Sequence, residues 1–381
     1  MDPGSLEDIG VTPVINACGI YTDFGGSRLS PSVWEAMTAL NDHFVRLPEL
    51  LDRTGARIAG LLGAEAARIT PGAAAAIMLG TAACMAGTDG ANSALLPDTR
   101  GMKNEVLIQA GHRYKYDRQV SMTGARLIDV GDEEGTEATQ LAAAIGPATA
   151  MILHPAHLDE VPGGQPLEAV AEIARERDVP VFVDAAYLNF PVELMSSFVA
   201  RGANLVAYSA KYFGGPNAGG FVMGDADLVA AVANVHFTRY ESGKYLKYGR
   251  PLKMDRQTII AVLVALEEWL AMDHTARFAN YRDQVNTLAG VLRGIEGIRL
   301  EPQCFTMDER FVSEPVNCLT IEFDADRPGR SAADVAAVLA AENPAIETIV
   351  DGERIGVVMD VLNDDEVLHI GARLRHALAA S

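Results

Sequence analysis

One lysine stands out among the residues that could do chemistry, because its neighbours are almost all apolar, small or turn-forming. Lys211 lies in "LVAYSAKYFGGPNAGG", between a run typical of a buried strand and a glycine-rich turn. Burial removes the water that solvates a lysine ammonium, which lowers its pKa and makes the neutral amine available as a nucleophile. The ordinary alternative is a lysine whose charged end extends to solvent.

Asp184 favours the chemical interpretation of Lys211. It ends a second apolar run, "VPVFVD", and a predicted helix and strand separate it from Lys211. A pyridoxal phosphate site needs such a pair: the lysine forms a Schiff base with the cofactor, and the aspartate keeps the pyridine nitrogen protonated so that the ring accepts electrons. We therefore predict that Lys211 and Asp184 are catalytic and bind this cofactor. A strand-end aspartate alone also occurs as a metal ligand or a helix cap.

A segment of small residues, "RITPGAAAAIMLG", predicts a phosphate-binding helix N-terminus. The backbone N–H groups of Gly72, Ala73 and Ala74 would point at one spot, and the absence of large side chains lets a phosphate approach closely. Ser209, two residues before Lys211, could add a hydroxyl to the same phosphate. The alternative is an ordinary buried alanine-rich helix.

Three histidines follow predicted strands. His112, in "QAGHRYKYD", is predicted to stack its flat ring on the pyridine and is counted among the catalytic residues. His154 and His157, in "HPAHLDE", could reach the substrate, and His157 is taken as a substrate-binding residue. Single histidines of this kind are also common as purely structural residues.

Other catalytic signatures are missing from the sequence. It contains no GxGxxG, GxxxxGK[ST], HExxH or GxSxG motif, so a nicotinamide enzyme or an ATPase is poorly supported. Its four cysteines lack metal-ligand spacing, which predicts no metal site and reduced thiols in a cytoplasmic protein.

The elements that must position these residues alternate in type along the chain. Between about residues 49 and 225, short apolar runs are separated by segments of helical period, which predicts a mainly parallel sheet covered on both faces. Ligands of such sheets bind beyond the carboxyl ends of the strands. We expect an N-terminal segment (1–45) that packs on the small domain, a cofactor-binding large domain (46–255) and a small α+β domain with a long connecting helix (256–381).

The charge and the hydropathy of the chain disfavour nucleic acid and membranes as binding partners. The 381-residue chain carries 31 basic and 51 acidic side chains, a net charge of −20, which disfavours nucleic acid as a partner. The densest basic stretch, residues 244–256, is short and predicts a site for a small anion. No uninterrupted apolar run is long enough for a membrane span, and the start of the chain does not resemble a signal peptide, so a cytoplasmic location is expected.

Several motifs together resemble those of a known family. They cover residues 11 to about 270 in order: "PVINACGIYTDFGGSRLSPSVWEAM", "NEVLIQAGHRYKYDRQVSMTGARLIDVG", "VPVFVDAAY", "LVAYSAKYFGGPNAGG" and "YGRPLKMDRQTIIAVLVALE". The chain resembles fold-type I pyridoxal phosphate enzymes, and among them the group of bacterial selenocysteine synthase and D-glucosaminate-6-phosphate ammonia-lyase.

The resemblance implies roles for particular residues. It makes Lys211 the Schiff-base lysine and Asp184 the partner of the pyridine nitrogen, with residues 72–74 as the phosphate cradle. It also implies that Arg28 and Arg250 face the active site. Lys253 would add a second positive charge beside Arg250 for an anionic substrate group. Because sites in this family are usually completed by a partner chain, a homodimer or a higher homo-oligomer is expected.

The function predicted from the sequence is that of a pyridoxal phosphate-dependent lyase. Its substrate would be a hydroxylated or anionic amino acid, from which it removes ammonia or a β-leaving group. A seryl-tRNA selenium transferase is the first alternative. It is disfavoured by the net charge and by the expectation that no tRNA-binding domain precedes the family-like sequence, which starts near residue 9. An amino acid racemase, an aldolase and a non-catalytic metabolite-binding relative remain further alternatives.

Overall fold

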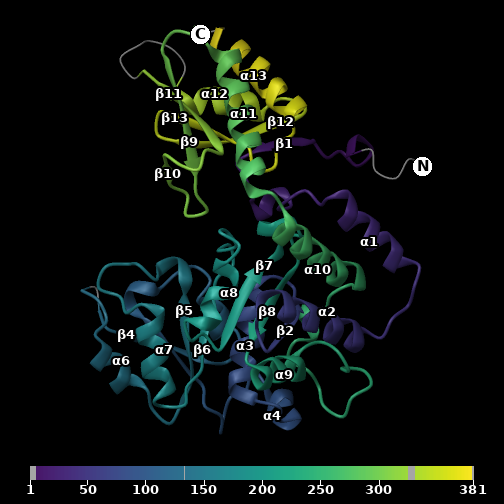
Figure 1. Cartoon of the computed structure of the whole chain (residues 1–381), viewed down its shortest axis with the longest axis vertical. Coiled ribbons are helices and arrows are strands. Elements are labelled where there is room, and N and C mark those ends of the chain that lie inside the picture. The colour runs from purple at the N-terminus through teal and green to yellow at the C-terminus, as the bar shows by residue number, and fades with distance from the viewer. Residues whose placement is uncertain (1–5, 133, 325–330, 380–381) are drawn as a thin grey trace. The chain divides into compact units, whose positions relative to one another are not determined.

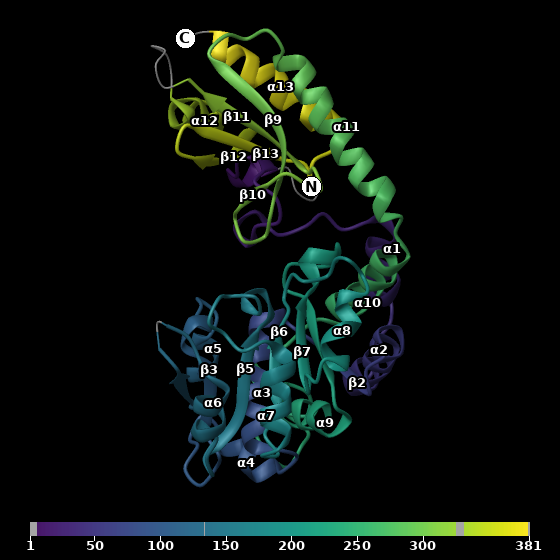
Figure 2. The same ribbon diagram turned by 60° about the vertical axis from the view of Figure 1, so that its left-hand side comes forward.

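The computed structural model describes residues 6–132, 134–324 and 331–379 (Figure 1 and Figure 2). The chain forms two compact units. The larger one is continuous in sequence and comprises residues 28–271, whereas the smaller one combines the residues up to 27 with those from 272 onwards.

The large unit is built on a seven-stranded sheet. Its strands are rich in Val, Ile, Leu and Ala, and most are buried along their whole length, as expected for strands covered on both faces. β8 runs antiparallel to both of its neighbours, β2 and β7, and the other pairs in the sheet are parallel. The order across the sheet is β2 (Ala66–Thr70), β8 (Gly220–Gly224), β7 (Leu205–Ser209), β6 (Val181–Asp184), β5 (Thr149–Pro155), β3 (Glu105–Gln109) and β4 (Arg126–Val130).

Helices cover both faces of this sheet, and alternate strand residues belong to two separate hydrophobic clusters. Leu107 and Val206 pack in one cluster, whereas their neighbours Ile108 and Leu205 pack in the other. The first cluster includes α2 (Leu47–Leu62), α6 (Ala138–Ala144), α7 (Leu167–Arg175), α8 (Leu194–Ala200) and α10 (Arg256–Ala271). The second includes α3 (Ala73–Ala86), α5 (Arg118–Ser121) and α9 (Ala226–Val235).

α3 lies very close to the sheet because its residues are small. A Cβ atom added at Gly80 would come within 2.2 Å of the Phe182 ring, so only glycine fits at this contact. Most residues of α3 are buried, which is consistent with a helix that is apolar all round. The alanine-rich segment is thus a core helix, and its first turn is at the carboxyl end of the strands, after β2.

The small unit has a six-stranded sheet in which β1 is parallel to β12 and the remaining pairs are antiparallel. Three helices pack with this sheet in a single hydrophobic cluster, and α11 and α13 run side by side (Figure 2). The strands, in sheet order, are β1 (Val14–Ala17), β12 (Ala345–Asp351), β13 (Arg354–Val358), β11 (Cys318–Phe323), β9 (Ile298–Phe305) and β10 (Phe311–Val312). The helices are α11 (His274–Leu292), α12 (Ala332–Ala340) and α13 (Asp364–Ala379).

The division into units differs from the boundaries expected at residues 45/46 and 255/256. β1 joins the small unit, but α1 (Pro31–Asn41) packs on α10, and the Ser30 hydroxyl donates a hydrogen bond to Glu268 at 2.6 Å. α10 in turn places Ile259 and Val262 in the core of the large unit. Both helices therefore belong to the large unit, because tertiary packing rather than sequence pattern decides to which core a helix belongs.

Candidate active site

The carboxyl ends of β2 and β7 and the start of β8 share one edge of the sheet, where Ser209 and the segment before residues 72–74 lie. Thr70 at the end of β2, Gly220 at the start of β8 and Ser209 at the end of β7 lie in register across the sheet. β8 runs in the opposite direction, so its first residue shares this edge with the last residues of β2 and β7. Lys211 follows two residues after Ser209 and therefore lies at the same edge.

Asp184 reaches this edge on the next strand. It ends β6, where it pairs in register with Ala207 of β7. The Ser209 N–H donates a hydrogen bond to the Ala186 carbonyl at 3.0 Å, which ties the segment after Asp184 to the segment before Lys211. The sheet thus gathers the predicted lysine and aspartate, as the spacing of their strands implies.

Lys211 lies in a single turn of 3-10 helix, η5 (Ala210–Phe213), and its side chain is buried. Its ammonium lies 4.8 Å from the centre of the Tyr212 ring. The glycines that follow let the chain fold back over this turn: a Cβ atom added at Gly215 would come within 2.7 Å of the Ala210 side chain. The glycine-rich sequence is therefore explained by close packing against the backbone that carries the lysine.

The Asp184 carboxylate is buried and holds a hydrogen bond on each oxygen. Its Oδ2 accepts from the Tyr114 hydroxyl at 2.6 Å, and its Oδ1 accepts from the Ala186 N–H at 3.1 Å. Burial raises the pKa of this carboxyl group, while the two hydrogen bonds and nearby His157 act in the opposite direction. Because a carboxylate can accept about four hydrogen bonds, Asp184 retains the capacity to bind a protonated ring nitrogen.

The N-terminus of α3 has the features of an anion site. Gly72 has a φ of +86°, a conformation that favours glycine, and the first intrahelical bond runs from the Ala76 N–H to the Gly72 carbonyl at 3.1 Å. No side chain caps the helix and its first turn carries no acidic residue, so the N–H groups of Ala73 and Ala74 face outward with a positive helix end behind them. A Cβ atom added at Gly220 would lie 2.8 Å from the Gly72 Cα, so β8 closely supports this turn.

Four rings form a line across this edge, a grouping that is not evident from the sequence. The ring centres of Tyr114 and His157 are 5.4 Å apart, those of His157 and Tyr187 are 5.8 Å apart, and those of Tyr187 and Tyr212 are 5.9 Å apart. Each of the three tyrosines lies within five residues of a strand end, and this position is the only signal in the sequence that could have indicated them. Together they give the site an aromatic wall beside Lys211.

The His112 side chain is buried, and its ring lies against His154 at the end of β5 and against Gly164 in the loop that follows. Its Nδ1 contacts the Gln109 side-chain amide at 3.3 Å, and its ring meets the His154 ring edge-on with centres 5.1 Å apart. Burial lowers the pKa of His112 to about 4, so its imidazole is neutral at physiological pH. Tyr114, two residues further on, makes the contact with Asp184. Stacking of His112 on a cofactor ring therefore stays a prediction.

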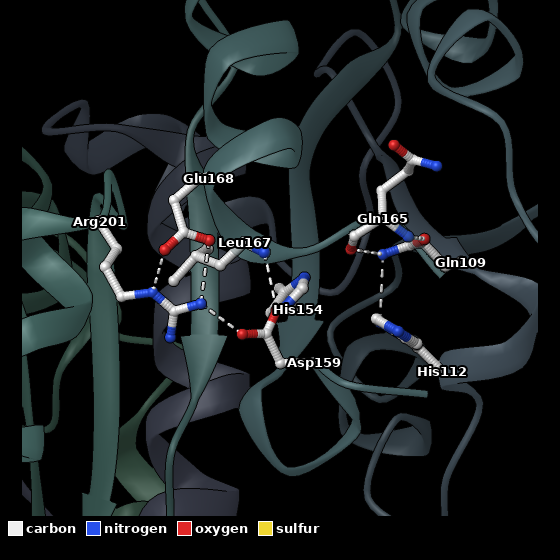
Figure 3. Close-up of polar contacts among 8 residues, drawn as sticks. All are labelled: Gln109, His112, His154, Asp159, Gln165, Leu167, Glu168 and Arg201. Carbon is white, nitrogen blue, oxygen red and sulfur yellow. Dashed lines mark hydrogen bonds and ion pairs between the residues drawn. The ribbon is translucent and has the colours of Figure 1, made fainter. Parts of the chain in front are cut away.

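His154 belongs to a network that fastens the loop between β5 and α7 (Figure 3). Its Nε2 lies 2.9 Å from Asp159 Oδ1, and the same carboxylate accepts from the Leu167 N–H at 2.7 Å and pairs with Arg201. These donors hold the pKa of Asp159 well below its usual range despite its burial. His154 thus has a structural partner, whereas His157, on the same loop, faces the rings of the aromatic line.

The predicted substrate-binding cations lie on other segments. Arg250 forms an ion pair with Glu241 at 2.9 Å, and its guanidinium lies 5.6 Å from the centre of the Tyr240 ring. Lys253 is exposed directly after the short turn η6 (Arg250–Leu252), and Arg28 is exposed at the start of the large unit. Arg250 therefore has a partner within its own loop, and the substrate roles of these three residues stay predictions.

Within residues 6–132, 134–324 and 331–379, no group of three or more His, Cys, Asp or Glu side chains is arranged to hold a metal ion. In the same part of the chain, no helix combines the length and the apolar character that crossing a bilayer requires.

The mainly parallel seven-stranded sheet, the smaller α+β unit and a lysine directly after a central strand define an enzyme of the fold-type I class, as predicted from the sequence. The family model for L-seryl-tRNA selenium transferase (SelA) matches residues 14–277. The chain therefore belongs to the SelA family.

Two proteins similar to this chain in sequence are enzymes by name. The chain is 31% identical over 351 residues to the 5'-C-glycyluridine monooxygenase-decarboxylase of a Streptomyces species, which covers 89% of this chain and 82% of that protein. It is 29% identical over 345 residues to the D-glucosaminate-6-phosphate ammonia lyase of Salmonella typhimurium, and the match covers 89% of this chain and 87% of that protein. A solved structure of D-glucosaminate-6-phosphate ammonia-lyase is 27% identical, with a TM-score of 0.86 over 100% of this chain and 99% of that one. These similarities confirm the resemblance and the fold class inferred from the sequence.

Proposed function

We propose that this protein is a pyridoxal phosphate-dependent lyase that eliminates ammonia or a β-leaving group from a hydroxylated or anionic amino acid. The observation that carries the proposal is the meeting of three features at one sheet edge: Lys211, Asp184 and the uncapped N-terminus of α3. Among the reactions considered, ammonia elimination agrees best with the comparisons, because D-glucosaminate-6-phosphate ammonia lyase is similar to this chain both in sequence and in solved structure.

The residues fit pyridoxal phosphate in charge and in hydrogen-bonding capacity. The N–H groups of Ala73 and Ala74 and the Ser209 hydroxyl would bind its phosphate, and the Asp184 carboxylate would bind its ring nitrogen. Lys211 Nζ would be the amine that binds it covalently. When bound, this cofactor supplies an electron sink for the bond that breaks at the substrate Cα.

Lys211 is also the group best suited to move a proton. Its Nζ is buried beside the Tyr212 ring, and in its neutral form it can take the Cα proton of the substrate and return a proton to the leaving group. The aromatic line of Tyr114, His157, Tyr187 and Tyr212 would exclude water from one side of this region. His157 is the member of that line with a titratable nitrogen, and it would contact a substrate hydroxyl group.

The anionic part of the substrate would be bound by arginine and lysine. Arg250 presents a planar guanidinium suited to a carboxylate or a phosphate, and Lys253 lies three residues further on. Arg28 would contribute a third positive charge. We place Arg250 and Lys253 in the site of a partner chain, because sites of the fold-type I class are usually completed by residues of a second chain, and we therefore propose a homodimer or a higher homo-oligomer. Within its own chain, Arg250 contacts Glu241 and Tyr240.

The test is a screen of the purified protein, reconstituted with pyridoxal phosphate, against hydroxylated amino acids and amino sugar acids with and without a phosphate. Ammonia and 2-oxo acid are measured together, and we expect them in equal amounts for the true substrate. Lys211→Ala is the matched inactive control. Lys211→Ala should also lack the absorbance change that wild-type protein gives when it binds the cofactor, which is a readout that does not depend on the substrate.

Other outcomes of the same screen point to the alternatives. Carbon dioxide release with oxygen uptake would support a reaction like that named for the Streptomyces relative. Salt-sensitive binding of seryl-tRNA would support selenium transfer. Loss of optical activity without ammonia would support a racemase. Absence of any cofactor binding would contradict the proposal as a whole.

A further inference from the structure

The structure gives Tyr114 a contact with Asp184 that the sequence did not indicate. It lies in the loop after β3, whereas Asp184 ends β6, and β5 lies between these two strands in the sheet. Its phenol therefore extends across the end of β5 to reach Asp184 Oδ2 at 2.6 Å. The sequence gives no reason to pair these two residues, which are 70 positions apart.

The loop that carries Tyr114 is itself fastened. The Tyr114 N–H donates to Asp117 Oδ2 at 3.1 Å, and Arg113 forms ion pairs with Asp117 at 2.5 Å and with Asp129 at 2.7 Å. Asp129 lies in β4, so the loop is anchored to the sheet. The loop that carries the phenol is thus held by charged contacts outside the site, and the Tyr114 side chain also packs against the second hydrophobic cluster.

The effect on Asp184 has two parts. A donor on each carboxylate oxygen, Tyr114 on Oδ2 and the Ala186 N–H on Oδ1, prevents the carboxylate plane from rotating. A hydrogen bond to the ionised form also stabilises that form, which burial alone disfavours. Among the described residues, the other titratable group that acts on Asp184 is His157, and Asp117 and Tyr116 act on Tyr114 from its own loop.

We propose that Tyr114 is a positioning residue for Asp184: its hydroxyl keeps this buried carboxylate ionised and oriented, so that a protonated ring nitrogen can bind to it. The inference rests on the proposed function, because it assigns the ring nitrogen to pyridoxal phosphate. Tyr114 would not react itself. It would set how firmly the ring nitrogen keeps its proton, and hence how strongly the ring withdraws electrons.

The first test uses the cofactor-free full chain, so it does not depend on catalysis. Infrared spectra recorded over a range of pH report the protonated form of a buried carboxyl group, and Asp184→Asn identifies its band. In Tyr114→Phe the titration midpoint of Asp184 should rise by about one to two pH units, the equivalent of one lost hydrogen bond to a charged group. Tyr116→Phe is the matched control, because Tyr116 is an exposed neighbour whose ring lies 6.0 Å from that of Tyr114.

A second variant reverses the sign of the effect. Replacing Tyr114 with 3-fluorotyrosine makes the phenol a stronger donor, so the midpoint should fall below that of wild-type protein. With bound pyridoxal phosphate labelled with ¹⁵N, the ring nitrogen signal should move towards that of unprotonated pyridine in Tyr114→Phe. An unchanged midpoint in both Tyr114 variants would overturn the inference. Failure of wild-type protein to bind the cofactor would instead refute the proposed function, and the cofactor-free titration would still decide the role of Tyr114.

Discussion

The N-terminus of α3 permits a test in which one substitution is expected to stabilise the protein and weaken cofactor binding at the same time. Ala74 is the second residue of the helix and is partly exposed, so an aspartate there needs no repacking of the core. In the cofactor-free protein, a carboxylate at this position interacts favourably with the helix end, by about 0.3–1 kcal/mol. We therefore expect Ala74→Asp to unfold at a slightly higher temperature than wild-type protein.

Cofactor binding should respond in the opposite direction. A carboxylate about 6 Å from a phosphate repels each phosphate charge by about 3 kcal/mol at an effective dielectric constant of about 20. If each of the two phosphate charges contributes only half of that energy, the total repulsion is still about 3 kcal/mol. This energy corresponds to a loss of cofactor affinity of at least about a hundredfold. Ala74→Asn is the control, because asparagine has nearly the same shape without the charge.

Absorbance titration with pyridoxal phosphate measures the affinity, and thermal melting of the cofactor-free variants measures the stability. The charge effect is the difference between Ala74→Asp and Ala74→Asn. If the two variants bind the cofactor equally well, the phosphate does not lie at this helix end, and the assignment of residues 72–74 as its cradle is wrong.

Three further predictions concern other parts of the chain. Gly220→Ala should lower both the melting temperature and the cofactor affinity, because the added Cβ would lie 2.4 Å from the Tyr208 carbonyl oxygen; unchanged values would contradict this close contact. Burial raises the pKa of Asp360 to about 6, so the folded state binds the proton of this carboxyl group more tightly than the unfolded state does. The free energy of unfolding that this proton contributes is fully present below about pH 4 and is lost as the pH rises through about 6. Urea unfolding of the small unit should therefore show Asp360→Asn as more stable than wild-type protein at pH 8 and equal to it at pH 4. Mixing inactive Lys211→Ala with inactive Arg250→Ala should restore part of the activity, because a mixed oligomer would contain one site with both residues intact. If no activity returns although subunit exchange is verified, Arg250 does not belong to the partner's site.

The residues at strand ends could be predicted because strand position and residue type are both visible in the sequence. Lys211 and Asp184 each follow a short apolar run, and a parallel sheet brings the ends of such runs to one edge. The glycine and alanines at 72–74 were recognisable for the same reason, since a run of small residues at a helix start after a strand is unusual. The fold class followed from these few positions together with the family resemblance, and so did the proposal that the cofactor is pyridoxal phosphate.

The aromatic line could not be predicted, because it depends on side-chain directions in loops. His112 and Tyr114 are only two residues apart, but the turn η3 (Ala110–His112) encloses the histidine, and the tyrosine reaches Asp184. Sequence spacing does not distinguish these two outcomes. The pairing of Arg250 with Glu241 and the membership of α10 in the large unit were hidden for a similar reason, since both depend on contacts between segments that local patterns do not connect.

The parallel pairing of β1 with β12 affects the order in which the protein can fold during its synthesis. β1 is synthesised well before its partner in the small unit, which follows roughly 330 residues later. At about 5–20 residues per second, β1 must wait for some 15–65 s without its neighbour. The large unit, which is continuous in sequence, can complete its core in that interval. β1 is therefore one of the last strands to be paired, although it is synthesised before the whole large unit.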